Sequence, residues 1–391
     1  MKKGLVLTKK NRLFPVLTYI TLLISIFYYI RNFGWGGGIE SFKLGTIVWP
    51  LVALFGAFIC ISKYFNKIWI INFGALYVFY NTIAIILGAS NSFKSIISSC
   101  IYAVLWFSLF VVFFDDSFSF GTAKINSVIF IIALPVIFVA FMVLVNTYSS
   151  QEAIKTLNPI FYILYLLPFL MLEKNKVFKT VGMVLIFIAI LVSYKRTAII
   201  AFVLILLYYL YRYMKETNKT PSSIVKLFGV IFASIIGLYF VYSQVISEYV
   251  ALDWLDRLTS LEETGGGGRV ERWKQFFEDM NNSNALQFLF GHGDVYPYYH
   301  NDLMQVFFNF GLIGSILYIG FCVQLVILYC KMNKAKYRFT SAYGASLIIF
   351  FLNSAVGQVI VVHTWFLQMA VFWGIVIGIF YKEKEHETQG G

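Results

Sequence analysis

A histidine near residue 300 and its neighbours have the side chains best suited to chemistry in this sequence. His300 and Asn301 are followed, after nine further residues, by Gly311 and Gly314 within a long apolar stretch. Two glycines on one helix face permit close packing or a bend. An imidazole ordinarily titrates near pH 6.5, so it accepts a proton readily at neutral pH. His300 is therefore a candidate general base, and a capping or interfacial histidine is the alternative interpretation.

Basic residues in two other places are candidates for binding an anion. Lys195 and Arg196 lie in a very short connection between two apolar stretches, and Arg269 and Arg272 begin a predicted amphipathic helix. A guanidinium binds phosphate oxygens in pairs and keeps its charge. A helix N-terminus would add amide donors for the same anion. These residues predict a diphosphate-binding site, and contact with ordinary phospholipid headgroups is the alternative.

Acidic and aromatic residues nearby are candidates for supporting roles. Asp294 and Asp302 flank His300 and could orient it or share proton transfer, although each could instead be a loop carboxylate or, for Asp302, a helix cap. Tyr299 and Trp273 could stack on a sugar ring, but an interfacial aromatic belt has the same composition. We find no clustered set of metal ligands, so we expect neither a metal nor a cofactor.

The elements that position these residues must be helices in a membrane. Hydrophobic residues make up 59% of the 391 positions, charged residues make up 13%, and the mean hydropathy is +0.76. A spanning helix needs about 20 apolar residues. The expected fold is therefore an all-α polytopic membrane protein of about twelve transmembrane helices. The predicted spans are residues 13–30, 44–61, 68–88, 96–114, 126–145, 158–172, 180–194, 197–211, 227–243, 303–330, 341–362 and 364–381.

The distribution of basic residues predicts the orientation of these helices. Lys and Arg collect in cytoplasmic segments, and an even number of spans places both termini on one side. With both termini in the cytoplasm, 21 of the 31 Lys and Arg residues lie on the cytoplasmic side. The net charge of +12 then reflects membrane topology, and no basic domain that would bind nucleic acid is evident.

The spans divide the chain into four predicted regions. Residues 1–243 form an N-terminal bundle of about nine helices, residues 244–302 a long extracytoplasmic loop, residues 303–381 about three C-terminal helices, and residues 382–391 a cytoplasmic tail. The loop is the only region that resembles a soluble domain, so chemistry is expected on the extracytoplasmic side, in and around it.

The long loop contains a predicted amphipathic helix from about Val270 to Met280. Trp273, Phe276, Phe277 and Met280 recur at helical spacing and form one apolar face, which is expected to lie on the membrane or the bundle. Four glycines at 265–268 precede this helix and would form a flexible approach or a plain linker. A second, shorter helix is predicted at Ala251 to Leu258.

Three motifs in the C-terminal half together carry a resemblance to a known family. They are Ser193-x-x-Arg196 before a span, Gly268-Arg269 followed by Trp273, and the segment from His300 to Gly314, which is preceded by Leu289-x-Gly291-x-Gly293. In this order they resemble the O-antigen ligase and O-antigen polymerase superfamily of bacterial membrane glycosyltransferases. The N-terminal half resembles that family only in being a helix bundle.

The resemblance implies specific roles for three residues. In that family an extracytoplasmic histidine and two arginines serve a metal-independent, inverting transfer of a glycan from a polyprenyl diphosphate. It therefore implies that His300 is the base and that Arg196 and Arg269 bind the diphosphate. This sequence departs from the family pattern because Tyr194-Lys195 precedes Arg196, where a bare Ser-Arg is more usual. Lys195 is consequently a candidate helper.

Several functions are compatible with this resemblance. We favour a polysaccharide polymerase for O-antigen, capsule or exopolysaccharide in the bacterial cytoplasmic membrane, because the Phe, Tyr, Ile, Lys and Asn bias is typical of polysaccharide gene clusters. Its expected partners are undecaprenyl-diphosphate-linked donor and acceptor oligosaccharides, membrane lipids and a chain-length regulator. The alternatives are an O-antigen ligase that uses lipid A core and a lipid-linked oligosaccharide transporter. Transport is disfavoured because the spans lack interior charges. A glycosyltransferase with Glu40 as its base is a further possibility.

Overall fold

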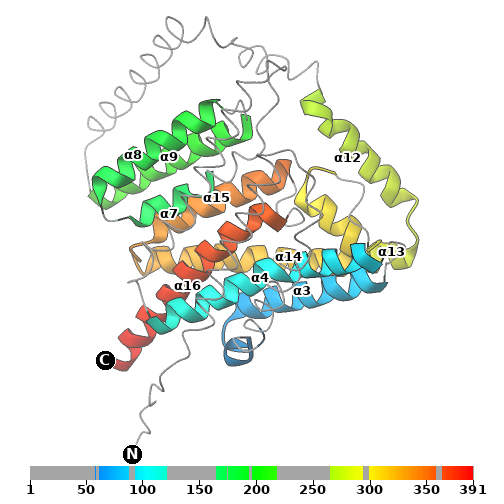
Figure 1. Cartoon of the computed structure of the whole chain (residues 1–391), viewed down its shortest axis with the longest axis horizontal. Coiled ribbons are helices and arrows are strands. Elements are labelled where there is room, and N and C mark those ends of the chain that lie inside the picture. The colour runs from blue at the N-terminus through cyan, green and yellow to red at the C-terminus, as the bar shows by residue number, and fades with distance from the viewer. Residues whose placement is uncertain are drawn as a thin grey trace, which may run out of the picture.

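The computed structural model describes residue 58 and residues 61–87, 93–120, 164–173, 175–192, 196–217, 265–293, 299–357 and 363–390. Every regular element within these ranges is a helix, which confirms the all-α class (Figure 1). The helices are α3 (Trp69–Leu87), α4 (Phe93–Phe120), α7 (Leu167–Leu172), α8 (Lys176–Val192), α9 (Arg196–Thr217), α12 (Gly265–Asn281), α13 (Ala285–Phe290), α14 (Asp302–Lys334), α15 (Thr340–Val356) and α16 (His363–Gly390).

The described helices overlap the apolar spans that the sequence predicts. By length and composition α3 and α14 are long enough to cross a membrane, and shorter apolar helices occur at Val177–Phe187, Thr197–Arg212 and Thr340–Val356. Because each helix satisfies its own backbone hydrogen bonds, such segments are stable in lipid. The predicted spans at 13–30, 126–145 and 227–243 and nearly all of 44–61 lie outside the described residues, so the number of spans stays a prediction.

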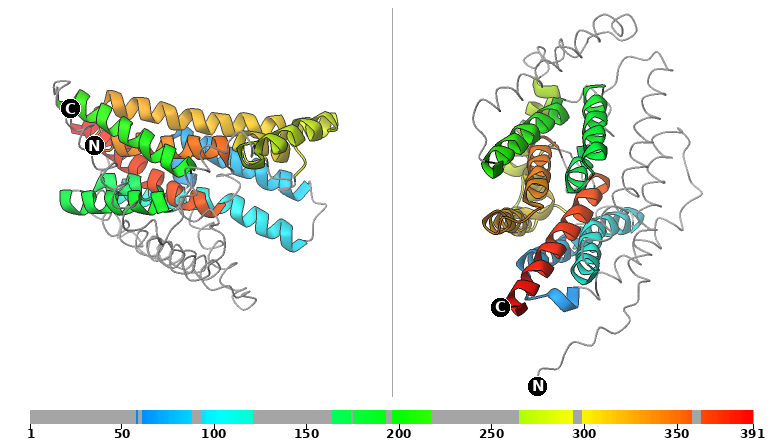
Figure 2. Two further views of the ribbon diagram at one scale, coloured as in Figure 1. Left: turned by 90° about the horizontal axis from the view of Figure 1, so that it is seen from above. Right: turned by 90° about the vertical axis from the view of Figure 1, so that its left-hand side faces the viewer.

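Long helices packed side by side form the centre of the structure. Helix α16 runs along α4, and α3 packs between α4 and α14 (Figures 1 and 2). Gly374 and Gly378 allow this closeness, because a Cβ atom on either would lie 2.5 to 2.6 Å from a carbonyl oxygen of α4. The indole of Trp373 is fully buried and donates to the Ser346 hydroxyl of α15 at 2.8 Å. Helix α15 in turn contacts α7 and α9.

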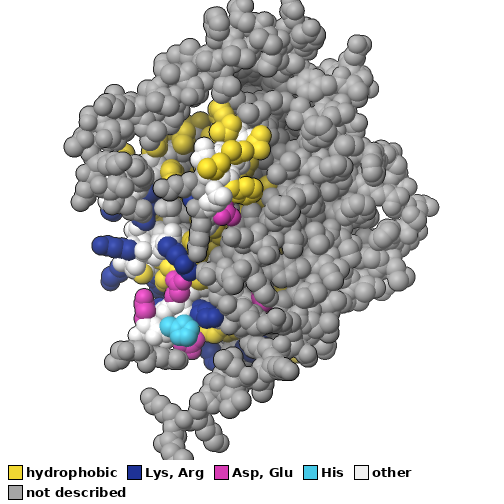
Figure 3. Space-filling model, turned by 60° about the vertical axis from the view of Figure 1, so that its left-hand side comes forward, with side chains coloured by type: hydrophobic (Ala, Val, Ile, Leu, Met, Phe, Trp, Pro, Cys, Tyr) yellow, Lys and Arg dark blue, Asp and Glu magenta, His cyan; other side chains and the backbone are white. Residues whose placement is uncertain are grey.

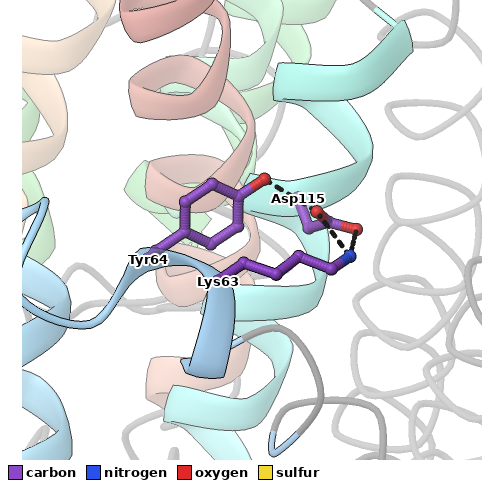
Figure 4. Close-up of polar contacts among 3 residues, drawn as sticks. All are labelled: Lys63, Tyr64 and Asp115. Atoms are coloured by element: carbon purple, nitrogen blue, oxygen red, sulfur yellow. Dashed lines mark hydrogen bonds and ion pairs between the residues drawn. The ribbon is translucent and has the colours of Figure 1, made fainter. Parts of the chain in front are cut away.

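Charged residues gather at one end of this bundle. The Lys63 ammonium lies 3.3 Å from Asp115, which also accepts a hydrogen bond from Tyr64 at 2.7 Å (Figure 4). Arg338 and Glu383 form an ion pair at 2.5 Å. Lys and Arg side chains are grouped on this face in Figure 3. Exposed ion pairs contribute little to stability, so their significance here is that they mark one end of the bundle.

The long polar loop provides α12 and α13, and one detail differs from the prediction. The glycines at 265–268 form the first turn of α12, with Gly268 at a φ of 77°, so they are part of the helix and do not precede it. On the predicted apolar face, Phe276 is buried in the protein and Phe277 is 59% exposed. The other predicted helix, Ala251 to Leu258, lies outside the described residues.

Helix α13 was not predicted, although the sequence contains its start signal. The Asn284 side chain accepts from the Gln287 backbone N–H at 2.9 Å, and the Gln287 side chain accepts from the Asn284 N–H at 3.0 Å. This reciprocal pair is a capping box, which satisfies two backbone donors that a helix start otherwise leaves unpaired. The Asn-x-x-Gln spacing is therefore what fixes the beginning of α13.

Candidate functional site

His300 occupies an exposed position between the long loop and α14. Its backbone has a φ of 54°, in the left-handed region that residues with a Cβ atom adopt rarely. Such a conformation costs free energy and persists where the surrounding structure holds it. The residues on either side of His300 provide that support.

Asn301 anchors the chain after His300. Its side-chain oxygen accepts from the Met304 backbone N–H at 3.1 Å, which makes Asn301 the N-cap of α14. Its side-chain amide donates to the Ala355 carbonyl oxygen at 3.0 Å and so ties this segment to the end of α15. Asp302 is consequently not the cap that the sequence allowed: it lies in the first turn and is fully buried. A carboxylate there interacts favourably with the helix dipole.

Tyr299 anchors the chain before His300. Its hydroxyl donates to the Asp279 carboxylate of α12 at 2.7 Å, and its backbone N–H donates to the Gln305 side-chain oxygen at 3.1 Å. The ring is fully buried between Phe276 and Phe308. Burial, and then the hydrogen bond to Asp279 and its charge, raise the pKa of the Tyr299 phenol well above its usual range. The phenol therefore remains a donor at neutral pH.

Helix α14 is broken at Gly311, and the loop after α13 pairs with the backbone that this break leaves open. Gly311 has φ 64° and ψ −165°, which are not helical. The backbone N–H groups of His292 and Gly293 donate to the carbonyls of Phe308 and Asn309, each at 2.9 Å. Carbonyl groups that lose helical partners must find others when buried. The residues at 291–293 therefore complete α14 across its break.

The His292 side chain has a structural role in this arrangement. Its Nδ1 lies 3.0 Å from the Phe308 carbonyl oxygen, and because a carbonyl only accepts, this nitrogen must carry a proton. Its Nε2 lies 3.2 Å from the Ser283 hydroxyl, and its ring stacks on the Phe308 ring with centroids 4.0 Å apart. Both ring nitrogens thus face protein atoms. Among the residues that the structure describes, no three His, Cys, Asp or Glu side chains group as metal ligands do.

Two glycines allow the backbones of the loop and α14 to touch. A Cβ atom on Gly291 would lie 2.2 Å from the Asn309 carbonyl oxygen, and one on Gly311 would lie 2.4 Å from the Leu289 carbonyl oxygen. Both glycines also have positive φ values. Gly291 of the Gly-x-Gly before His300 and Gly311 of the Gly-x-x-Gly after it therefore lie against each other in one backbone contact.

Tyr80 of α3 fastens this contact to the bundle. Its hydroxyl lies 3.1 Å from the Phe290 carbonyl oxygen and 3.0 Å from the Phe310 carbonyl oxygen, one on each side of the contact. Nothing in the sequence singles out Tyr80, because its partners are more than 200 positions away. Its role depends entirely on how α3 and α14 pack.

The candidate anion ligands are only partly described. Arg196 is the first residue of α9, its side chain lies outside the described atoms, and Lys195 and Asp294 lie outside the described residues. Arg269 is half-buried near the start of α12, whereas Arg272 is exposed and donates to Gln275 at 3.0 Å.

Helix α12 meets the His300 segment through its C-terminal half. Asp279 and Phe276 make that contact, and Arg269 lies about 15 Å further along the helix axis from Asp279, given a rise of 1.5 Å per residue. Trp273 is half-buried, and its indole N–H is buried without a partner among the described residues. That donor lies one turn from Arg269 on α12.

Gln305 is the residue of this site that sequence reasoning missed. It is fully buried, and with Asp302 and Asn309 it forms a row of polar residues at helical spacing inside an apolar stretch. Burying ionisable or amide side chains in an apolar helix costs free energy unless they are hydrogen-bonded, so such residues usually have a structural or functional role. The spacing of Asp302, Gln305 and Asn309 in the sequence is the signal that could have identified Gln305.

An apolar groove of about 460 Å³ runs between α14 and α15, and its lining includes Asn301, the residue that follows His300. Asn301 and Ala355 line its upper end, and Tyr318, Val323 and Ile327 line its length. Tyr318 and Ile327 are about 14 Å apart along α14. No charged side chain lines the groove, so its surface suits a hydrocarbon chain.

Apolar helices, two of them long enough to cross a membrane, indicate a helical membrane protein, and the exposed His300 before α14 marks the candidate site. Residues 181–319 match the family described as O-antigen ligase. This match includes Arg196, Arg269 and His300 and confirms the resemblance to the O-antigen ligase and polymerase superfamily, whose members are glycosyltransferase-like membrane enzymes that use lipid-linked glycans. No curated protein matches the chain.

Proposed function

We propose that this protein is a polysaccharide polymerase on the outer face of the bacterial cytoplasmic membrane. It joins oligosaccharide repeat units of O-antigen, capsule or exopolysaccharide, which are carried on undecaprenyl diphosphate. The observation that best supports this proposal is an exposed histidine, held between two anchored residues, one of which, Asn301, lines an apolar groove. The match of residues 181–319 supports the same class of reaction.

In the proposed reaction His300 removes the proton from an acceptor sugar hydroxyl. The hydroxyl oxygen forms a bond to the anomeric carbon of the donor glycan, the bond from that carbon to the diphosphate oxygen breaks, and the configuration inverts. The electron pair leaves with the undecaprenyl diphosphate. Arg196 and Arg269, with Lys195 and Arg272 near them in sequence, stabilise this charge, as fixed cationic donors do in other transfers.

The groove explains how a lipid-linked substrate would be held at this place. A diphosphate with its sugar is polar and belongs at the Asn301 end, whereas the isoprenoid chain is apolar and fits between α14 and α15. The polar head would then lie beside His300 while the chain stays in the membrane. Asn301 contributes to both parts, because it lines the groove and caps α14.

Replacing the three proposed active residues tests this function. We expect His300→Ala to lower kcat by about 10² to 10⁴, the usual contribution of a general base. Arg196→Ala and Arg269→Ala should each lower it by about 10². Lys274→Ala is the matched control, because Lys274 is an exposed basic residue on the same helix as Arg269. The measurement is polymer length in cells that lack the native gene, with protein abundance determined in the same samples.

The outcomes separate this proposal from its alternatives. Full-length polymer from the His300→Ala protein would remove the general-base role. Normal polymer that fails to reach lipid A core would identify an O-antigen ligase in place of a polymerase. Lipid-linked repeat units that remain on the cytoplasmic side in the absence of the gene would identify a transporter.

A further inference from the structure

The orientation of His300 depends on the residues that hold its backbone. A φ of 54° is unfavourable for a histidine unless its neighbours are fixed. The Asn301 side chain is held by its hydrogen bonds to the Met304 backbone N–H and to the Ala355 carbonyl oxygen. Tyr299 is fixed through its ring and hydroxyl, but its main chain, which leads directly into His300, is held by the Gln305 side chain.

Gln305 is suited to this task because both ends of its amide are used. Its oxygen accepts from the Tyr299 backbone N–H at 3.1 Å, and its nitrogen donates to the Asn309 side-chain oxygen at 2.9 Å. The backbone N–H can only donate, so the amide has one permitted orientation. Gln305 is fully buried, so water cannot replace it as the partner of Tyr299.

Further hydrogen bonds extend this amide pairing in two directions. Asn309 accepts from Gly293 through its backbone carbonyl, beside the break in α14. Tyr299 continues through its hydroxyl to Asp279 of α12. The main chain before His300 is thereby linked to α12, to the loop at 291–293 and to the broken part of α14. The buried Gln305 side chain joins the hydrogen bonds of Tyr299 to those of Asn309.

We infer that Gln305 is a positioning residue that sets the backbone of His300 through the Tyr299 N–H. The inference rests on the proposed role of His300 as the base. Gln305 does not touch the substrate in this scheme and acts only through the peptide before His300. Its loss should misplace the imidazole and leave the binding of the lipid diphosphate, which depends on the arginines, unchanged.

Gln305→Leu is the direct test, because leucine cannot accept the Tyr299 hydrogen bond. The enzyme is the purified full-length chain in nanodiscs, and the substrate is undecaprenyl-diphosphate-linked oligosaccharide extracted from cells that lack the native gene. We expect kcat to fall about 10- to 100-fold, because a displacement of about 1 Å at a reacting group costs up to about 10². KM for the lipid-linked oligosaccharide should stay within about 2-fold.

Asn309→Leu is the matched control within the same polar row. It removes the other hydrogen bond of the Gln305 amide, at a similarly buried position, but leaves the Tyr299 bond in place. We expect kcat within about 3-fold of the unchanged protein. An equal loss of kcat in both variants would show that Gln305 is important only for folding, and a KM that rises as kcat falls would show that Gln305 acts on substrate binding. Either result would overturn the inference.

Gln305→Glu is informative even where Gln305→Leu does not fold. A carboxyl accepts from the Tyr299 backbone N–H in both its protonated and its ionised form, whereas only the protonated form can donate to Asn309. Because the Tyr299 hydrogen bond is kept, we expect kcat within about 3-fold of the unchanged protein, as for Asn309→Leu. A loss of kcat as large as the one expected for Gln305→Leu would contradict the inference.

The same assay separates failure of this inference from failure of the proposed function. If His300→Ala is fully active, His300 is not the base and the proposed function fails. If His300→Ala is inactive while Gln305→Leu keeps normal kcat, the proposed function stands and only the role of Gln305 is wrong.

Discussion

Tyr299 joins two helices at the position immediately before His300. Its hydroxyl contacts α12, its ring packs between Phe276 and Phe308, and its backbone is held by Gln305 of α14. A buried phenol is costly without a hydrogen-bond partner, and the Asp279 carboxylate supplies one. A shift of α12 would therefore move Tyr299, the residue next to the candidate base His300.

Tyr299→Phe should measure this connection. Removing the hydroxyl leaves Asp279, which is partly exposed, to water, so we expect the free energy of unfolding to fall by about 1–2 kcal/mol. Thermal unfolding in detergent micelles is the measurement. Asp279→Asn is the control: it keeps an acceptor and should cost less than Tyr299→Phe.

The raised pKa of Tyr299 also predicts the pH range over which its hydroxyl stabilises the folded protein. The unfolded phenol loses its proton near pH 10, whereas the folded phenol keeps it to higher pH because of burial and Asp279. The stabilisation is therefore fully present below about pH 10 and is lost as pH rises through the folded pKa. The difference between the unchanged protein and Tyr299→Phe should stay constant from about pH 6 to 9 and shrink well above pH 10. A difference that changes between pH 6 and 9 would contradict this assignment.

Helix α14 works as two segments because of its break at Gly311. The segment before the break carries the polar row of Asp302, Gln305 and Asn309, and the longer segment after it is mostly apolar. The loop at 291–293 and Tyr80 of α3 supply hydrogen bonds at the break. A broken helix with its backbone paired by protein is tolerated in a membrane. The break thus lets the end of α14 carry polar groups beside the polar loop.

Gly311→Ala should disrupt this element strongly. Its φ and ψ lie in a region essentially restricted to glycine, and a Cβ atom would lie 2.4 Å from the Leu289 carbonyl oxygen. We expect a loss of more than about 3 kcal/mol, or failure to fold. Gly268→Ala is the control, because Gly268 also has a positive φ but no atom within 4 Å of the new Cβ. It should cost only about 1 kcal/mol.

The yield of folded protein and its unfolding temperature in detergent measure both glycine variants. Equal losses in Gly311→Ala and Gly268→Ala would mean that the backbone conformation alone matters. In that case the close approach of the loop at 291–293 to α14 would not be a stabilising feature.

Across the whole molecule the charged end and the site end lie opposite each other. Helices α3 and α14 run antiparallel, so the Lys63 and Arg338 regions share one end while α12, α13 and the start of α14 after His300 lie at the other (Figure 1). Basic residues favour the cytoplasmic side, so this arrangement agrees with the predicted extracytoplasmic site. In the proposed orientation the groove extends from the candidate site toward the membrane interior.

Filling the groove should therefore weaken the binding of the lipid chain. Val323→Trp places a large ring on a half-exposed groove position, and Leu76→Trp does the same on α3, away from the groove. We expect Val323→Trp to raise KM for an undecaprenyl donor about 10-fold, or about 1.4 kcal/mol, with little change in kcat. Leu76→Trp should have no such effect. KM for a donor with a short prenyl chain should not change in either variant. Equal effects of the two variants would contradict binding of the lipid chain in the groove.

Much of the fold and part of the site could be predicted from local features of the sequence. The apolar runs near α3, α14 and α15 mark those helices, because lipid selects apolar side chains position by position. His300 and Asn301 were recognisable by their types and their spacing from Gly311. The glycine turn of α12 was not, because periodicity alone does not determine where a helix begins.

The residues alone show that this chain is helical and apolar, and they identify the histidine and arginines that are candidates for chemistry. The contact between Gly291 and Gly311, the hydrogen bonds from Tyr80 and the bond from the Tyr299 N–H to Gln305 are visible only in the folded chain. Helix formation depends on side chains close in sequence, whereas these contacts depend on which helices pack together. The Tyr80 hydroxyl and the Phe290 carbonyl are 210 positions apart in the chain and 3.1 Å apart in space.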